Sequence, residues 1–253
     1  MRILSLNCQK DYNLGLPPFL TKTLAADTYD ILLLQEVTRP VLELLANSKY
    51  SVLNVFDEQV RQQSELAIAY RPALTFRSHQ FLSFATLRPE MPIPFNHAPF
   101  GALLGILDYA GDTYAFCSMH LDSGIRSSVR VLELMRLKQF LPKDVPVLFA
   151  GDFNFGLPGE LSRAARLLAP DFHCATRRLG GTLDSRYSEY ANHLPNKIAR
   201  IGAVFGLGVK LRADHFFTNA LFSRGKSLSC RILPDRVSDH SPIELVTSAQ
   251  TAK

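Results

Sequence analysis

The sequence contains no tryptophan and only four cysteines among its 253 residues. The cysteines stand at positions 8, 117, 174 and 230 with no CxxC pair, a pattern that excludes a disulfide scaffold and a cysteine-bound zinc site. The longest uncharged, glycine-rich run, residues 201–209, is shorter than the roughly 20 residues that a membrane-spanning helix needs. The first residues follow an alternating strand pattern without the features of a signal peptide, so we expect a reduced, cytoplasmic protein.

Linkers, repeats and low-complexity segments are also missing from the sequence. Hydrophobic residues make up 47% and charged residues 20% of the chain, which is typical of globular proteins and excludes disordered and collagen-like ones. A chain of this length buries a sizeable core, and no shift in composition marks a domain boundary. We therefore predict a single domain over residues 1–253.

Positive charge is concentrated in the last third of the chain. The formal net charge is +5, yet residues 1–160 hold 14 basic and 16 acidic side chains, whereas residues 161–253 hold 14 basic and 7 acidic ones. Such an excess suits a polyanionic partner, either nucleic acid or an acidic membrane surface. The alternative is a solvated surface with an arbitrary excess of charge.

Short apolar, β-rich segments alternate with helical segments along the chain. The predicted strands are residues 3–7, 31–35, 66–70, 103–107, 114–119, 145–150, 215–218 and 243–246. The predicted helices are residues 40–46, 125–138 and 158–168. This pattern predicts an α/β domain with mixed sheets and with long loops at residues 86–99 and 173–212.

Polar side chains gather at the ends of these apolar strands. Ligand groups in α/β sheets collect at strand ends, where rigid backbone holds them and loops leave access, so we expect these residues to form one site. The candidates are Asn7, Glu36, His120, Asp152, Asn154, Asp214, Asp239 and His240.

The candidates are rich in oxygen ligands and include no cysteine, which favours a hard cation, Mg²⁺ or Mn²⁺, over zinc. Because one or two carboxylates usually hold Mg²⁺ in proteins, the other acids and amides are available for proton transfer and orientation. The two histidines add donors for phosphate oxygens. Together these groups indicate metal-assisted hydrolysis of a phosphoester.

Each candidate also has a local structural explanation, as a strand cap, a helix-entry acid, a turn residue, a core histidine or a surface acid. Turn roles suit Asp152 and Asn154, which stand beside a glycine, and a core role suits His120. These explanations are not independent, because the site hypothesis requires all the candidates to converge. Cys8 and Cys117 lie beside candidates and are interpreted as packing residues.

Six short motifs resemble those of the endonuclease/exonuclease/phosphatase superfamily, the metal-dependent phosphoesterases related to pancreatic deoxyribonuclease. They occur in the family's order and extend from residue 3 to residue 242. The motifs are ILSLN at 3–7, LQEV at 34–37, SMHL at 118–121, GDFN at 151–154, RADHFF at 212–217 and SDHSP at 238–242. The resemblance implies a four-layer α/β/β/α sandwich, with two mixed β-sheets flanked by helices.

The resemblance also implies the residues that hold a metal ion. Glu36 would hold the divalent cation, helped by Asn7 and Asp239. We expect this cation to be Mg²⁺, with Mn²⁺ as a substitute.

Catalytic roles are carried over in the same way. Asp152 would position or deprotonate the attacking water, and Asn154 would hold that water or a phosphate oxygen. His240 would donate to the developing charge of the phosphate, oriented by Asp214. His120 would give a second phosphate contact or protonate the leaving group.

Glu65 precedes an apolar segment and resembles the acid that orients the second histidine in the deoxyribonuclease branch. Three departures separate the chain from abasic-site endonucleases, which usually carry an acid at the position of Gln9, a tyrosine near that of His120 and commonly a tryptophan before the motif of Asp214. The histidine points instead to the branch shared by deoxyribonucleases, sphingomyelinase-like enzymes and some phosphatases.

Nucleic acid is the leading candidate substrate, because basic and aromatic residues are interleaved between two of the motifs. Arg177, Arg178 and Arg186 would follow a phosphate backbone while Tyr187 stacks on a base. A solvated loop that folds over its own domain explains the same residues. We therefore expect a metal-dependent phosphodiesterase, most simply a nuclease acting on DNA or RNA.

Two other functions remain open at this point. Cations on both sides of the apolar residues 201–209 would suit an anionic lipid surface, as in a phospholipid, sphingomyelin-type or small phosphate-ester hydrolase. A non-catalytic nucleic-acid-binding module would bind without Mg²⁺ and cleave nothing.

Overall fold

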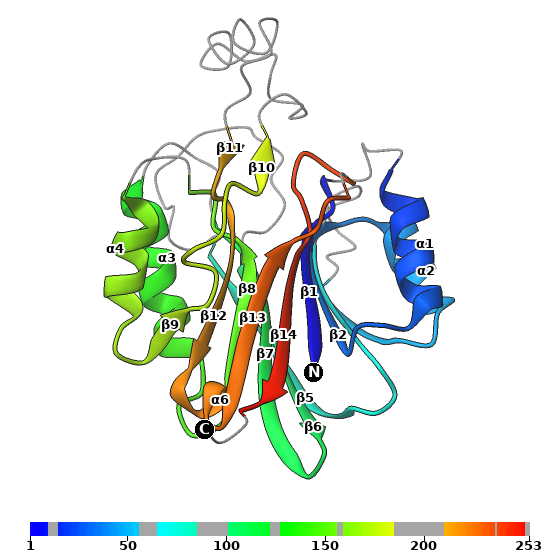
Figure 1. Cartoon of the computed structure of the whole chain (residues 1–253), viewed down its shortest axis with the longest axis horizontal. Helices are drawn as coiled ribbons and strands as arrows, with labels where there is room; N and C mark the ends of the chain where they lie inside the picture. The colour runs from blue at the N-terminus through cyan, green and yellow to red at the C-terminus, as the bar shows by residue number, and fades with distance from the viewer. Residues whose placement is uncertain are drawn as a thin grey trace, which may run out of the picture.

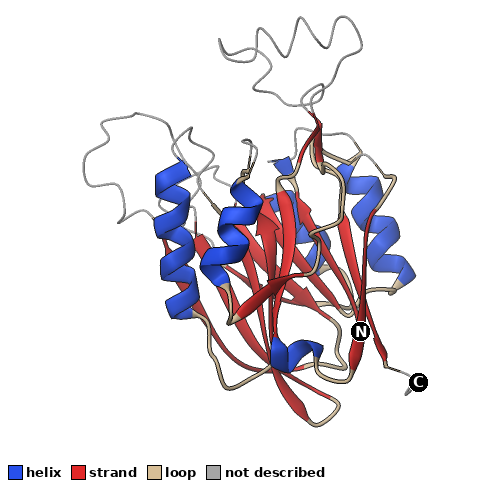
Figure 2. Ribbon diagram, turned by 60° about the vertical axis from the view of Figure 1, so that its left-hand side comes forward, coloured by secondary structure: helices blue, strands red, loops and turns tan. Residues whose placement is uncertain are grey.

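The computed structural model describes residues 1–9, 15–55, 65–84, 101–121, 127–155, 159–184, 210–235 and 237–250. Two six-stranded sheets pack face to face, and helices cover their outer faces (Figures 1 and 2). The fold is therefore the expected α/β/β/α sandwich. Within the described residues, no helix combines the length and the hydropathy that a membrane span requires.

The first sheet has the strand order β13-β14-β1-β2-β4-β3. Only β1 and β2 run parallel, and the other neighbours are antiparallel. The strands are β1 (Arg2–Asn7), β2 (Ile31–Val37), β3 (Ser51–Asn54), β4 (Glu65–Tyr70), β13 (Lys226–Ile232) and β14 (Ile243–Ala249). Helices α1 (Leu16–Ala26) and α2 (Arg39–Ala46) cover its outer face.

The second sheet has the order β5-β6-β7-β8-β12-β9, with β7 and β8 as its parallel pair. Its strands are β5 (Thr75–Ser83), β6 (Gly101–Tyr109), β7 (Asp112–His120), β8 (Val147–Asp152), β9 (Phe172–Cys174) and β12 (Asp214–Asn219). Helices α3 (Ser127–Phe140) and α4 (Glu160–Leu168) cover its outer face, and the short α6 (Ala220–Ser223) follows β12. A small ribbon of β10 (Leu183–Asp184) and β11 (Lys210–Leu211) rises at one end of the sandwich.

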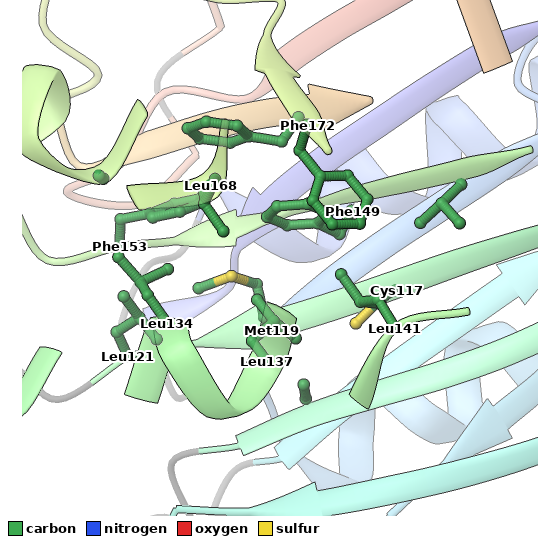
Figure 3. Packing of buried hydrophobic residues seen from close by; sticks show 14 of the residues in the cluster. Cys117, Met119, Leu121, Leu134, Leu137, Leu141, Phe149, Phe153, Leu168 and Phe172 are labelled. Carbon is green, nitrogen blue, oxygen red and sulfur yellow. The ribbon is translucent and has the colours of Figure 1, made fainter. Parts of the chain in front are cut away.

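Apolar side chains form three layers because successive strand residues point to opposite faces of a sheet. On β7, Phe116 packs between the two sheets, whereas Cys117 and Met119 face the helices. Figure 3 shows this helix-side cluster, in which Leu134 and Leu137 of α3 share one core with the strand residues. Burial on both faces explains why the central strands are continuously apolar in the sequence.

All eight predicted strands and all three predicted helices are confirmed, with ends that differ by a few residues. The sequence patterns did not indicate α1, α6, β3, β5, β9 to β11 or β13. Strand β5 is polar and largely exposed at the edge of its sheet, so it lacks the apolar alternation on which strand prediction relies. Of the two predicted long loops, residues 86–99 lie outside the described residues, and residues 173–212 contain β10 and β11.

A buried carboxylate ties together three strands of the first sheet. Glu244 on β14 is 1% exposed and accepts hydrogen bonds from Arg2 on β1 and Arg231 on β13. Burial alone would raise the pKa of Glu244, but the two guanidinium groups outweigh it and lower this pKa below 4.5.

Replacing Glu244 by glutamine should lower the free energy of unfolding by about 1–3 kcal/mol at pH 7, because two charged hydrogen bonds lose their anion. A carboxylate with a lowered pKa contributes stability above its unfolded pKa, and this contribution is lost as pH falls through the folded pKa. The difference between the wild type and Glu244→Gln should therefore shrink below about pH 4.5. Urea unfolding at pH 7 and at pH 3.5 measures it, and a difference independent of pH would contradict this role.

Candidate active site

The two parallel strand pairs bring the candidate residues to one end of the sandwich. Asn7 at the end of β1 lies beside Gln35 of β2, and His120 at the end of β7 lies beside Asp152 of β8. Asp214 opens β12 directly opposite Asp152. The convergence that the sequence predicted is therefore present, at the end of the sandwich that carries β10 and β11.

A glycine allows β7 and β8 to meet closely at this end. Gly151 has a φ of +150°, and a Cβ atom there would lie 1.8 Å from the carbonyl oxygen of Met119. No side chain fits in that space, because the neighbouring atom belongs to the backbone. Gly151 thereby permits the side-by-side placement of His120 and Asp152.

Glu36 reaches the site through an irregularity in β2. The pairing of β2 with β4 shifts register between Leu34 and Val37, and Glu36 adopts a left-handed backbone with φ 51°. A regular strand would direct Glu36 to the face opposite that of Gln35. The bulge turns its carboxylate toward Asn7 and His120.

Asp152 occupies the centre of the site and is 1% exposed. Its Oδ2 atom accepts a hydrogen bond of 2.9 Å from Nδ2 of Asn7, and it lies 3.6 Å from Nε2 of His120 and 3.6 Å from Nε2 of His240. Its Oδ1 atom accepts the backbone N–H of Asn154 at 2.7 Å. One buried carboxylate thus faces an amide, a peptide N–H and two imidazoles.

Asp214 orients His240 from the opposite side. Oδ2 of Asp214 lies 2.8 Å from Nδ1 of His240, and because a carboxylate accepts, Nδ1 carries the proton. Thr182 fixes the acid in turn, since its Oγ1 accepts the backbone N–H of Asp214 at 3.0 Å. The predicted carboxylate–imidazole pair is therefore present in the structure, with Nε2 of His240 directed toward Asp152.

The opposite charges of Asp152 and His240 stabilise one another. Burial raises the pKa of Asp152 to about 6, although the imidazole of His240 opposes the rise. Burial acts to lower the pKa of His240, but the nearby carboxylates, led by Asp214 and Asp152, outweigh it and hold this pKa well above 6.5. At neutral pH the site therefore holds an Asp152 carboxylate beside a protonated His240.

Three buried groups meet the geometric conditions for a metal site. Ligand atoms of Asp152, Asp214 and His240 lie within 4.8 Å of one another. Oδ1 of Asp214 is buried and has no hydrogen-bond partner among the described residues, so an acceptor is left for a cation or another donor. The two carboxylates fit a hard divalent cation, whereas His240 could bind one only after losing a proton.

The remaining predicted residues are placed as follows. Nδ2 of Asn154 donates to the carbonyl of Leu121 at 2.8 Å, and Oδ1 of Asp239 lies 3.8 Å from Nε2 of His240. Glu65 begins β4 opposite Val37, but its side chain lies outside the described set. Arg177 and Arg178 are exposed in the turn after β9, and residues 186 and 187 lie outside the described residues.

Several residues that support the site carry no clear signal in the sequence. Thr182 holds the backbone of both Asp214 and Ser241, and Gln9 and Ser238 join the end of β1 to the segment of Asp239 and His240. Threonine, glutamine and serine are common surface residues, and their roles depend on partners far away in the chain. Ser238 is the exception, because its place at the start of the SDHSP motif indicates that it lies near the site.

Comparison with protein families decides the wider identity of the chain. Residues 4–240 match the model of the Endonuclease/Exonuclease/phosphatase family. The chain belongs to this family. It is accordingly a phosphoesterase, a hydrolase of a family that depends on metal ions.

Several solved structures share the fold of this chain. TDP2 from D. rerio, crystallised with a single-stranded DNA product, matches with a TM-score of 0.75 at 18% identity, over 98% of this chain and 99% of that chain. Truncated TDP2 from Caenorhabditis elegans gives 0.71 at 15%, over 98% and 97%. A mannosyl-6-phosphatase from Bacteroides thetaiotaomicron gives 0.68 at 14%, over 98% and 99%. None of the curated protein sequences matches the chain.

Replacing Gly151 by alanine should lower the free energy of unfolding by about 2–3 kcal/mol, because the new methyl group has to displace the backbone of β7. Gly180→Ala is the matched control, since its nearest atom would lie 3.9 Å away. Urea unfolding of both variants measures the effect. Equal losses of stability in the two would show that the close approach at Gly151 is not required.

Proposed function

We propose that this protein hydrolyses phosphodiester bonds in nucleic acid with the help of Mg²⁺, by attack of a water molecule that Asp152 activates. The observation that carries the proposal is the surroundings of Asp152. A single buried carboxylate oxygen faces the two imidazoles and the amide of Asn7, while Glu36 lies at the edge of the same cluster. This hydrolysis needs a proton acceptor, groups that donate hydrogen bonds to phosphate oxygens and an acidic group for the cation, roles that suit Asp152, the two imidazoles and Glu36.

Glu36 is the residue that we expect to hold the cation, with Asp239 and Asn7 beside it. Mg²⁺ would supply positive charge to the phosphate oxygens and so favour attack at phosphorus. Glu36 is suited to this role because its side chain remains 18% exposed, which leaves room for a ligand, whereas Asp152 is almost fully enclosed. Asp214 is engaged with His240 through one oxygen and acts as its orienting acid.

The protein groups then divide the proton transfers between them. Asp152 takes a proton from the water as the new P–O bond forms, with its second oxygen fixed by the Asn154 N–H. His240 donates from Nε2 to a phosphate oxygen that gains charge, held in that orientation by Asp214. His120 gives a proton to the leaving oxygen as the ester bond breaks.

Cationic side chains near the site favour a substrate with several phosphates. Arg177 and Arg178 are exposed, and Nη1 of Arg212 donates to the carbonyl of Arg177 at 3.4 Å. Arg212 lies two residues before Asp214, so the turn that carries Arg177 and Arg178, hereafter the basic turn, lies next to the end of β12 that carries Asp214. Nucleic acid supplies phosphates at regular spacing to such a surface, which a small phosphate ester does not.

A buried histidine keeps the basic turn in place. His215 lies between Thr176, 3.0 Å from its Nδ1, and the carbonyl of Arg212, 3.0 Å from its Nε2. A carbonyl only accepts, so Nε2 donates and Nδ1 accepts from the hydroxyl of Thr176. Burial lowers the pKa of His215 to about 4, so the ring stays neutral and this chain of hydrogen bonds persists at physiological pH.

Cleavage assays test the proposal directly. Supercoiled plasmid and labelled single-stranded DNA and RNA are incubated with the protein in Mg²⁺, Mn²⁺ or EDTA. Cutting that requires the metal would establish a nuclease, and the preferred substrate would define its type. A folded, metal-binding protein that cuts none of them would contradict the nucleic-acid proposal and favour a phospholipid or small phosphate ester.

Asp152→Asn should abolish turnover, by at least about a thousandfold, because the amide cannot accept the proton of water. The amide keeps the shape of the side chain and can still meet Asn154, so the variant should fold. Cleavage rates at saturating Mg²⁺, with circular dichroism as the check of folding, measure the effect. Asp112→Asn, at an exposed hairpin position, is the control and should keep wild-type activity.

Replacing Arg177 and Arg178 together by alanine should weaken binding of duplex DNA and lower its dependence on salt. Each lost phosphate contact reduces the slope of log K against log salt by about 1. Fluorescence anisotropy of catalytically inactive protein gives this slope when binding is measured between about 50 and 200 mM salt. Arg224→Ala is the control, since Arg224 is an exposed cation next to α6. An equal slope in both variants would remove the basic turn from the binding surface.

A further inference from the structure

We propose that Gln9 is a positioning residue that ties Asn7 to Asp239 and thereby sets the affinity of the site for its divalent cation. The inference rests on the proposed function, since it takes these residues as the neighbours of the cation. It adds a residue that the motifs leave out and that acts through others.

The backbone of Gln9 is held in an unusual conformation. Gln9 lies two residues beyond the end of β1, is 7% exposed and has a φ of 49°. Left-handed backbone is uncommon for a residue other than glycine, and it persists where the surroundings over-determine it. The partners of Gln9 supply that reason.

Gln9 makes two hydrogen bonds with residues of the site. Its backbone N–H donates to Oδ1 of Asn7 at 2.9 Å, and its side-chain Oε1 accepts the backbone N–H of Asp239 at 2.9 Å. Asn7 and Asp239 come from opposite ends of the chain. Gln9 therefore bridges two segments that meet only in the folded protein.

The first bond decides which end of the Asn7 amide faces the acids. A backbone N–H only donates, so the atom opposite it has to be the amide oxygen. The amide nitrogen then points away from Gln9, where it donates to Asp152 at 2.9 Å and to Glu36 at 3.2 Å. The backbone N–H of Gln9 thus orients the Asn7 amide, and the amide nitrogen in turn holds the carboxylates of Asp152 and Glu36 near each other.

The second bond fixes the backbone from which the Asp239 carboxylate projects. Ser238 makes a separate link between the same segments, because its hydroxyl lies 2.8 Å from the carbonyl of Asn7. The two segments should therefore stay together when the side chain of Gln9 is changed. What changes is the placement of Asp239, and outer partners of this kind typically alter metal affinity by about 10–100-fold.

A glutamine provides this acceptor without a charge. A glutamate at position 9 would accept the same N–H and add a negative charge to a site that already holds Glu36, Asp152 and Asp239. The added charge would attract a cation more strongly. The pair of substitutions Gln9→Met and Gln9→Glu therefore separates the hydrogen bond from the size of the side chain.

Isothermal titration calorimetry of the metal-free protein with Mn²⁺ and with Mg²⁺ tests the inference. Gln9→Met should bind each cation at least about tenfold more weakly than the wild type, and Gln9→Glu should bind at least as tightly as the wild type. Gln80→Met is the control, because Gln80 is exposed on the edge strand β5, and should bind like the wild type. Saturating metal should restore most of the kcat of Gln9→Met, with the defect expressed as a higher metal requirement.

Amide hydrogen exchange gives a second readout that needs neither metal nor substrate. The Asp239 amide should exchange at least about tenfold faster in Gln9→Met than in the wild type, and at the wild-type rate in Gln9→Glu. A folded Gln9→Met variant with unchanged cation affinity would overturn the inference while leaving the proposed function intact. A wild-type protein that binds neither cation would overturn both. If Gln9→Met does not fold, weakened cation binding by Gln9→Glu would overturn the inference on its own.

Discussion

The candidate active site is organised around one negative charge, that of Asp152, which is kept out of water between the two sheets. An isolated buried carboxylate is costly, and here its neighbours offset the cost: the amide of Asn7, the N–H of Asn154 and the imidazole of His240. These neighbours come from different strands and loops of both sheets. The site therefore exists only when the two sheets are stacked in the correct register.

The fold meets this demand with parallel strand pairs and a few backbone exceptions. The β1–β2 and β7–β8 pairs deliver polar ends to the same edge, and β12 delivers Asp214 opposite Asp152. Gly151 permits the close approach of β7 and β8, and left-handed backbone turns Glu36 from its regular strand direction, while Asn154 adopts the same conformation just after β8. Of the five non-glycine residues with positive φ in the described part of the chain, three, Gln9, Glu36 and Asn154, lie at the candidate site, where such strain is common.

Much of this arrangement could be predicted before the structure. Continuous apolar runs such as residues 147–150 mark strands that are covered on both faces, and the polar residues that follow them mark the edge where a site forms. Segments such as β5 and β9 could not be found this way, since periodicity records burial and these elements are either largely exposed or too short to repeat. Helix α1 does carry a helical pattern, because it spans 11 residues and buries Leu16, Leu20 and Leu24 at a spacing of four. Glu36 was recognised by its motif, although its regular strand direction would have placed it on the wrong face.

Residue types, their order and the strands that carry them can all be read along the chain, and these features already indicate the family and its phosphoesterase chemistry. Those features are local, because they depend on side-chain periodicity and on neighbours within a few positions. Which atoms face each other depends on the folded chain: the proton on Nδ1 of His240, the orientation of the Asn7 amide and the hydrogen bond between Gln9 and Asp239. These contacts join residues up to 230 positions apart, and hydrogen bonding at about 3 Å depends on the stacking of two sheets, which no local pattern records.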